Sequence, residues 1–122
     1  MPKKILVTDD SPTIVAMIKE LLDSNGYSVV TASDGQEALD QAKKEKPDLI
    51  ILDLMLPKID GYKVCAIVKV DQNYSSIPVI ILTARAGESD KELGVEVRAD
   101  AYVTKPLEPN TFLAKVKEFI KE

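Results

Sequence analysis

Short apolar runs recur along the chain, separated by longer segments of mixed polarity. Five runs are rich in β-branched residues, and they cover residues 5–7, 29–32, 49–52, 79–82 and 101–103. Runs of this length and composition are typical of strands in a buried sheet. The second and fifth runs carry polar positions, whereas the other three are almost wholly apolar. We therefore expect five strands, with the second and fifth at the sheet edges.

Two of the intervening segments have the apolar spacing of amphipathic helices. Residues that repeat at i, i+1, i+4, i+7 and i+8 share one helix face. This spacing occurs twice, at Ile14, Val15, Ile18, Leu21 and Leu22, and at Phe112, Leu113, Val116, Phe119 and Ile120. The pattern predicts one helix after the first strand and one after the last.

Capping residues predict where helices begin. Ser11 followed by Pro12 marks the start of the first helix, and Asp34 with Glu37 forms a capping-box-like start for a second. Asp60 opens a third helix, which carries Val64, Ile67 and Val68. A fourth helix is expected over residues 89–97, where poor helical periodicity predicts the least stable helix.

Strands that alternate with helices form a parallel sheet with right-handed crossovers and helices on both faces. With the second and fifth strands at the edges, the expected order is 2-1-3-4-5, that of flavodoxin-like doubly wound α/β folds. The sequence shows no repeat, linker or low-complexity tract. We therefore expect one domain over residues 1–122, with a five-stranded parallel sheet and five helices.

Composition narrows the functions open to such a domain. Of the 122 residues 45% are hydrophobic, so the chain can bury a core. No apolar run approaches the roughly 20 residues of a membrane span. No signal peptide is visible, and the single cysteine, Cys65, cannot form an internal disulfide. These features predict a cytoplasmic protein without membrane contacts, in which Cys65 is a small core residue.

The absence of histidine and the negative net charge exclude further classes of function. The chain contains no histidine, which excludes Ser-His-Asp and Cys-His catalysis and histidine-rich metal sites. Sixteen basic residues against twenty acidic residues give a net charge of −4. We therefore expect no direct binding of nucleic acid through a basic surface.

Three carboxylates are predicted to meet at one edge of the sheet. Asp9 and Asp10 directly follow the first strand, and Asp53 lies near the end of the third. Open α/β sheets bind ligands beyond the carboxyl ends of the strands where the strand order reverses, here between strands one and three. Close like charges are unfavourable unless a cation intervenes, and Mg²⁺ is a hard cation that prefers oxygen ligands. The sequence therefore predicts a magnesium site.

Two further side chains follow the last two strands at the same edge. Thr83 offers a hydroxyl, and Lys105 offers a fixed positive charge. A carboxylate nucleophile, a divalent cation, a hydroxyl and a lysine together can accept a phosphoryl group and stabilise its oxygens. These residues indicate phosphorylation of an aspartate.

The candidate residues belong to a series of motifs. In chain order these are Asp9-Asp10, Asp53, Met55-Leu56-Pro57 with Asp60-Gly61, Thr83-Ala84, and Ala99-Asp100-Ala101-Tyr102 ending in Lys105-Pro106. Together they resemble the CheY-like receiver domain of two-component response regulators, and the resemblance covers essentially the whole chain.

The resemblance implies a role for each site residue. Asp53 would be the phosphoacceptor, and Lys105 would pair with Asp53 and then with the phosphoryl group. Thr83 would hydrogen-bond a phosphoryl oxygen, and Tyr102 would turn inward when Thr83 moves. The Mg²⁺ ligands would be Asp10, Asp9 directly or through water, Asp53, and the backbone carbonyl of Met55.

Residues around the site carry further implications of the resemblance. Lys105-Pro106 would be a cis peptide. The lifetime of the phosphoryl group would be tuned by its neighbours Met55, Ala84 and Arg85.

Two positions depart from the family pattern. Arg98 stands where the family usually has glycine, so we expect a rearranged loop before the fifth strand. Some DNA-binding members of the family dimerise through the fourth helix, fifth strand and fifth helix. In that dimer an acidic residue before the tyrosine commonly pairs with a basic residue of the last helix. Here these positions hold Ala101 and Lys115. We therefore expect a monomer or a weak dimer.

The resemblance implies a signalling switch rather than an enzyme that acts on other molecules. The domain would take its phosphoryl group from a histidine kinase or a phosphotransfer protein, and would catalyse only its own phosphorylation and dephosphorylation. Its face of fourth helix, fifth strand and fifth helix would then control an output domain or a downstream protein.

Three other functions fit the residues less well. A Mg²⁺-dependent phosphohydrolase with an aspartate nucleophile would carry Asp-x-Asp on the first strand, which here ends Asp9-Asp10-Ser11. A flavin- or nucleotide-binding module needs a phosphate cradle after that strand, where Asp9 and Asp10 would repel phosphate. A receiver-shaped interaction module that is never phosphorylated would not need the full set of site residues.

Overall fold

A five-stranded parallel sheet forms the centre of the computed structural model, which describes residues 3–54, 56–83, 99–105 and 107–120. The strand order is β2-β1-β3-β4-β5, and each neighbouring pair is parallel. The strands are β1 (Lys4–Thr8), β2 (Ser28–Ala32), β3 (Leu49–Asp53), β4 (Val79–Thr83) and β5 (Ala101–Thr104). The predicted order and the edge positions of β2 and β5 are confirmed.

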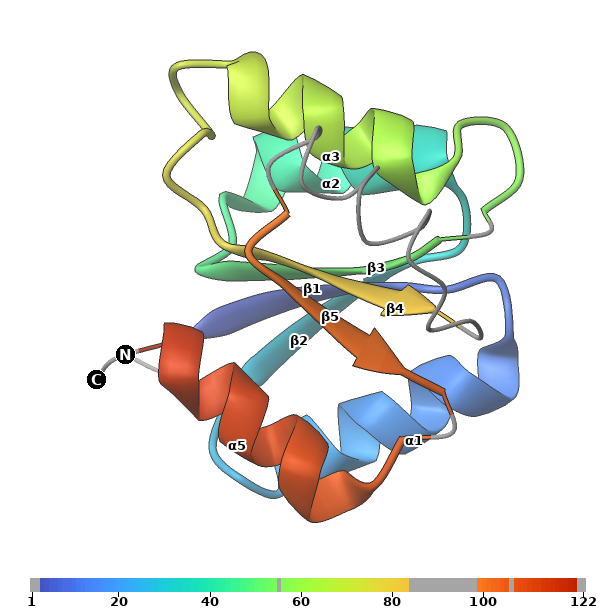
Figure 1. Cartoon of the computed structure of the whole chain (residues 1–122), viewed down its shortest axis with the longest axis vertical. Helices are drawn as coiled ribbons and strands as arrows, with labels where there is room; N and C mark the ends of the chain where they lie inside the picture. Colours follow the sequence, from blue (N-terminus) through green and yellow to red (C-terminus); the bar gives the residue numbers. More distant parts are fainter. Residues whose placement is uncertain (1–2, 55, 84–98, 106, 121–122) are drawn as a thin grey trace.

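Helices cover both faces of the sheet (Figure 1). On one face lie α2 (Gly35–Glu45) and α3 (Gly61–Val70), and on the other lie α1 (Pro12–Asp23) and α5 (Pro109–Phe119). The helix expected over residues 89–97 and the loop with Arg98 fall outside the described residues. Among the helices that are described, none is long and apolar enough to cross a membrane. Because helices lie on both faces of a parallel sheet, the predicted doubly wound α/β fold is confirmed.

Side-chain caps start the helices where the sequence predicts. Ser11 Oγ accepts a hydrogen bond from a backbone N–H in the first turn of α1 at 3.3 Å, and Asp34 Oδ1 accepts one from the N–H of Glu37 at 2.8 Å. Glu37 in turn accepts from the N–H of Ser33 at 2.7 Å, one residue before the position of a standard capping box. Asp60 caps α3 in the same way.

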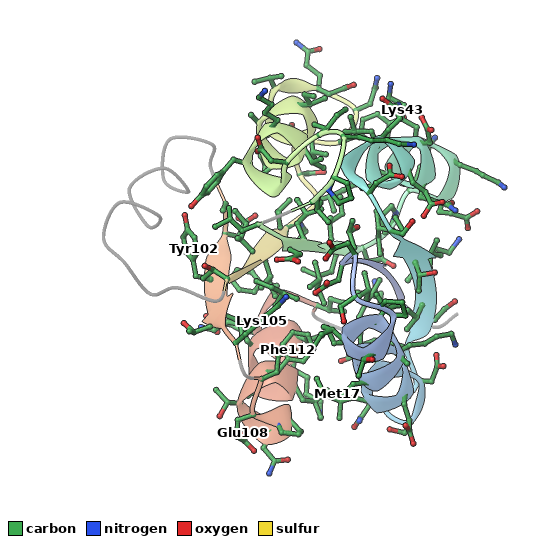
Figure 2. The ribbon with its side chains drawn as sticks, turned by 90° about the vertical axis from the view of Figure 1, so that its right-hand side faces the viewer. Met17, Lys43, Tyr102, Lys105, Glu108 and Phe112 are labelled. Carbon is green, nitrogen blue, oxygen red and sulfur yellow. The ribbon has the colours of Figure 1, made fainter. Side chains whose placement is uncertain are left out.

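The sheet buries an apolar cluster on each face. Leu6 and Ile81 belong to the cluster beneath α2 and α3, whereas Val7 and Leu82 belong to the cluster beneath α1 and α5. Phe112 lies between α5 and α1 in Figure 2 and is fully buried. Every residue of β3 and β4 is buried, so packing on both faces fixes the ends of these two strands.

Helix α3 buries one of its faces in the core. Its buried residues include Gly61, Val64, Cys65 and Val68, which follow the i, i+3, i+4, i+7 spacing of one helix face. Val64 and Val68 are buried, whereas Ile67, the third apolar residue noted for this helix in the sequence, is 42% exposed. Its position falls on the flank of the arc that the other four residues define.

Cys65 should resist alkylation while the domain is folded. Its side chain is fully buried, and this burial raises the pKa of the thiol to about 11. Because the thiolate is the reactive form, ionisation alone should slow iodoacetamide labelling at pH 8 by about a hundredfold relative to the unfolded chain. Labelling rates with and without denaturant measure this difference, and equal rates would place Cys65 outside the core.

Candidate functional site

The three predicted carboxylates meet beyond the carboxyl ends of β1 and β3. Carboxylate oxygens of Asp9, Asp10 and Asp53 all lie within 4.8 Å of one another. Asp9 and Asp53 are buried, with 1% and 6% of their surface exposed, whereas Asp10 is exposed. The cluster lies where the strand order reverses, since β1 pairs with β2 on one side and with β3 on the other.

Asp9 is held from two sides. Its Oδ1 accepts a hydrogen bond from the N–H of Ser11 at 2.9 Å, and its Oδ2 accepts one from Lys105 Nζ at 2.9 Å. Ser11, rather than Asp9 or Asp10, is the N-cap of α1. The two neighbouring carboxylates are therefore not explained by capping of this helix.

Lys105 brings a positive charge into the acidic cluster. Its Nζ lies 2.9 Å from Asp9 Oδ2 and 3.4 Å from Asp53 Oδ2, and Figure 2 shows the residue near the middle of the strand-end edge. The family resemblance implies a pair with Asp53, whereas the shorter contact is with Asp9. Burial lowers the pKa of the Lys105 ammonium, but the hydrogen bond to Asp9 and the charge of Asp53 outweigh it and raise the pKa above its usual value.

Thr83 ends β4 next to the cluster. Leu82 pairs in register with Asp53, so Thr83 lies one residue beyond the level of that carboxylate. Thr83 is 3% exposed, and its backbone carbonyl accepts a hydrogen bond from the N–H of Lys105 at 2.7 Å. This bond ties the end of β4 to the residue that follows β5, so Thr83 and Lys105 are positioned together.

Tyr102 lies in the edge strand β5, in register with Ile81. It is partly buried, packs against the apolar cluster beneath α2 and α3, and stands near the outer side of the sheet in Figure 2. Its predicted rotation stays a prediction. Met55, Ala84, Arg85 and Pro106 lie outside the described residues, so the predictions for them and for the Lys105-Pro106 peptide bond stay predictions.

Two glycines bring the loop after β3 close to its neighbours. A Cβ on Gly61 would overlap the carbonyl oxygen of Asp53, and a Cβ on Gly35 would overlap the carbonyl oxygen of Ile59. Gly61 belongs to one of the motifs recognised in the sequence, whereas Gly35 belongs to none of them. The available signal was an Asp-Gly pair at the start of both α2 and α3.

The chain is similar in sequence to known proteins over nearly its whole length. A family model, described as the response regulator receiver domain, matches residues 5–117. The alkaline phosphatase synthesis transcriptional regulatory protein PhoP of Bacillus subtilis (strain 168) is 50% identical over 121 residues, which are 99% of this chain and 50% of that protein. The chain spans about half the length of the curated relatives it matches.

Solved structures share the fold over nearly the whole chain. A putative response regulator from Chloroflexus aurantiacus J-10-fl has a TM-score of 0.93 and 38% identity, with 98% of each chain covered. The receiver domain of the sensor histidine kinase PA1611 from Pseudomonas aeruginosa PAO1 has a TM-score of 0.91 and 29% identity, with 100% of each chain covered. In that protein a magnesium ion is coordinated in the active site cleft.

Proposed function

The chain belongs to the response regulator receiver domain family, and from this premise we propose that it is a phosphorylation-controlled signalling domain whose phosphoacceptor is Asp53. The observation that carries the proposal is the position of Asp53 in one cluster with Asp9 and Asp10, with Lys105 in contact with it. Two of the three carboxylates are buried, and closely spaced like charges are unfavourable unless a cation lies between them, so stability alone explains the cluster poorly.

Asp53 is the proposed nucleophile. It is the last residue of the fully buried strand β3, so packing of the strand holds its backbone up to this residue. During transfer one carboxylate oxygen forms a bond to phosphorus while the bond between phosphorus and the donor atom breaks, and the electron pair leaves with the donor. Lys105 presents N–H donors to the negative charge on the phosphoryl oxygens, as catalysis of phosphoryl transfer requires.

The donor set of the site fits Mg²⁺. Asp9, Asp10 and Asp53 offer closely spaced carboxylate oxygens, which are ligands that Mg²⁺ prefers, and they would hold the ion together with the carbonyl of Met55. A bound Mg²⁺ would supply positive charge to the carboxylates and to the phosphoryl oxygens. Asp9 is already bound to Lys105, so Asp10, which is exposed, is the carboxylate most accessible to a metal from solvent.

The proposed donor is the phosphohistidine of a histidine kinase or a phosphotransfer protein. The domain is proposed to catalyse only its own phosphorylation and dephosphorylation. The alternative of a phosphohydrolase is disfavoured because Asp53 lies on β3, whereas such enzymes would carry their nucleophile on the first strand. Phosphorylation is then proposed to regulate an output domain or a downstream protein.

We propose that the signal leaves through β5, α5 and the helix expected over residues 89–97. The bond between the Thr83 carbonyl and the Lys105 N–H connects the site to the end of β5. A groove of about 290 Å³ lies between β5 and α5, and Tyr102 is part of its lining. Lys115 also lines the groove and pairs with Glu118 of its own helix at 3.1 Å, so a partner is not needed to neutralise it.

Asp10→Ala should raise the Mg²⁺ concentration needed for phosphorylation. Loss of one direct oxygen ligand should raise the half-maximal Mg²⁺ concentration by about tenfold or more. The measurement is labelling by acetyl phosphate at increasing MgCl₂, followed by intact mass. Asp40→Ala is the matched control, because Asp40 is exposed on α2 and accepts a hydrogen bond from Gln36 of the same helix.

Labelling of the unaltered domain tests the proposed function itself. A single added phosphoryl group that requires Mg²⁺ would support it, and labelling that is indifferent to Mg²⁺ would contradict it. An unchanged Mg²⁺ requirement in Asp10→Ala would reject Asp10 as a metal ligand.

A further inference from the structure

The start of α2 packs directly on the loop that follows Asp53. The N–H of Gly35 donates a hydrogen bond to the carbonyl of Pro57 at 3.2 Å. A Cβ on Gly35 would overlap the carbonyl oxygen and carbon of Ile59, and also its Cβ. None of these atoms is the free end of a flexible side chain. Any side chain at position 35 would therefore have to push the loop backbone away from α2.

The loop has little freedom to absorb such a push. The carbonyl of Pro57 also accepts the N–H of Ile59 at 2.8 Å, around Lys58, whose φ is 68°. A hydrogen bond from residue i+2 to residue i around a positive φ marks a γ-turn of the rare, strained kind. Such a turn persists only where its surroundings hold it, and Gly35 is one of its neighbours.

The far end of the loop is joined to Asp53. The N–H of Gly61 donates to the carbonyl of Leu54 at 3.1 Å, and a Cβ on Gly61 would overlap the carbonyl oxygen of Asp53. Ile59 lies two residues before Gly61. Ile59 is therefore joined through Gly61 to the backbone of Leu54 and Asp53.

We propose that Gly35 is a positioning residue for the metal and phosphoryl site. Its missing side chain lets α2 hold the β3–α3 loop in the conformation that aims Asp53 at Asp9 and Asp10. Gly35 touches none of these carboxylates and acts through Ile59 and the loop. This inference rests on the proposed function, since it concerns the same Mg²⁺ site.

The ion pair between the N-cap of α2 and the loop is too weak for this role. Lys58 Nζ lies 3.5 Å from Asp34 Oδ2, and the Lys58 side chain is 68% exposed. Exposed ion pairs contribute little because solvent screens them. Close packing of Gly35 on Ile59, together with the hydrogen bond from Gly35 to Pro57, is therefore the stronger contact between α2 and the loop.

Gly35→Ala is a direct test, because alanine should suit the backbone at this position. Gly35 lies in the first turn of α2 and does not have a positive φ, and alanine has the higher helix propensity. The contact with Ile59 is then the source of the effect. We expect the Mg²⁺ affinity, measured by calorimetric titration, to fall about tenfold, as for other residues that orient metal ligands.

Gly26→Ala is the matched control. Gly26 has a φ of 89°, and a Cβ there would meet no atom within 4 Å. Alanine at this position strains the backbone without touching the loop, so it should lower the thermal midpoint and leave the Mg²⁺ affinity within about twofold of the unaltered protein. A Gly35→Ala protein that loses stability but keeps its Mg²⁺ affinity would show that Gly35 is merely structural, which overturns the inference.

A second measurement uses the unaltered protein, so it tests the inference even if the Gly35→Ala protein does not fold. If the loop position affects Mg²⁺ binding, Mg²⁺ must stabilise that loop position in return. Addition of MgCl₂ should therefore slow hydrogen exchange of the Gly35 and Ile59 amides and leave the Gly26 amide unchanged. Absence of protection at Gly35 would overturn the inference alone, whereas an unaltered protein that binds no Mg²⁺ would overturn both the inference and the proposed function.

Discussion

Asp53→Asn should abolish transfer of a phosphoryl group to the domain. Asparagine keeps the shape of the side chain at the end of β3, so the fold should be retained, but it lacks the carboxylate oxygen that forms the bond to phosphorus. With acetyl phosphate and Mg²⁺, we expect the labelled fraction to fall by about a hundredfold or more relative to the unaltered protein. Intact mass measures the fraction, and circular dichroism confirms that the variant is folded.

The matched control for this experiment is Asp40→Asn, which makes the same chemical change on the exposed side of α2. It should leave labelling unchanged. Labelling of Asp53→Asn at the level of the unaltered protein would assign the acceptor to another residue, with Asp9 and Asp10 as the nearest carboxylates.

Asp100→Ala should lower the free energy of unfolding by about 3 kcal/mol. Lys69 on α3 is 8% exposed, and its Nζ lies 2.8 Å from Asp100 Oδ2. The same ammonium donates to the carbonyl of Ile77 at 2.7 Å, and Asp100 Oδ2 accepts from the N–H of Val79 at 2.7 Å. Removal of one partner from a buried ion pair costs about 3–5 kcal/mol, and the lower end applies because the Asp100 side chain is 33% exposed.

Substitution of the other partner, Lys69, should lower the free energy of unfolding by a smaller amount. Lys69→Met removes the buried charge and leaves Asp100 in contact with solvent, so its penalty is the loss of hydrogen bonds to the carbonyls of Ser75 and Ile77. Denaturant unfolding measures both variants. If Lys69→Met lowered the free energy of unfolding as much as Asp100→Ala or more, the assignment of Lys69 as the more deeply buried partner would be contradicted. Under conditions where both variants are folded, each should still be labelled at Asp53.

The sheet could be predicted from the sequence because the burial of a strand determines which of its residues are apolar. Strands β3 and β4 are covered on both faces and appear as unbroken apolar runs, whereas β2 and β5 have one uncovered edge and carry polar residues. The meeting of Asp9, Asp10 and Asp53 followed from that order, because carboxyl ends of adjacent parallel strands lie at the same edge of the sheet.

Pairwise contacts could not be predicted in the same way. Lys69 lies on α3 and Asp100 directly precedes β5, and neither stands out in the sequence from the other charged residues of the chain. The closer contact of Lys105 with Asp9 than with Asp53 depends on how the chain leaves β5, which no local pattern encodes. Gly35 was missed for a related reason, because its role arises from packing against a loop that follows it by more than twenty residues in sequence.

The most direct test of the central claim is to locate the phosphoryl group. The unaltered domain is treated with acetyl phosphate and Mg²⁺ and then with borohydride, which reduces an aspartyl phosphate to homoserine. Peptide mass spectrometry then identifies the modified residue. We predict homoserine at Asp53, and none when Mg²⁺ is removed with a chelator. Homoserine at Asp9, Asp10 or any other aspartate, or a stable phosphate on serine or threonine, would contradict the account.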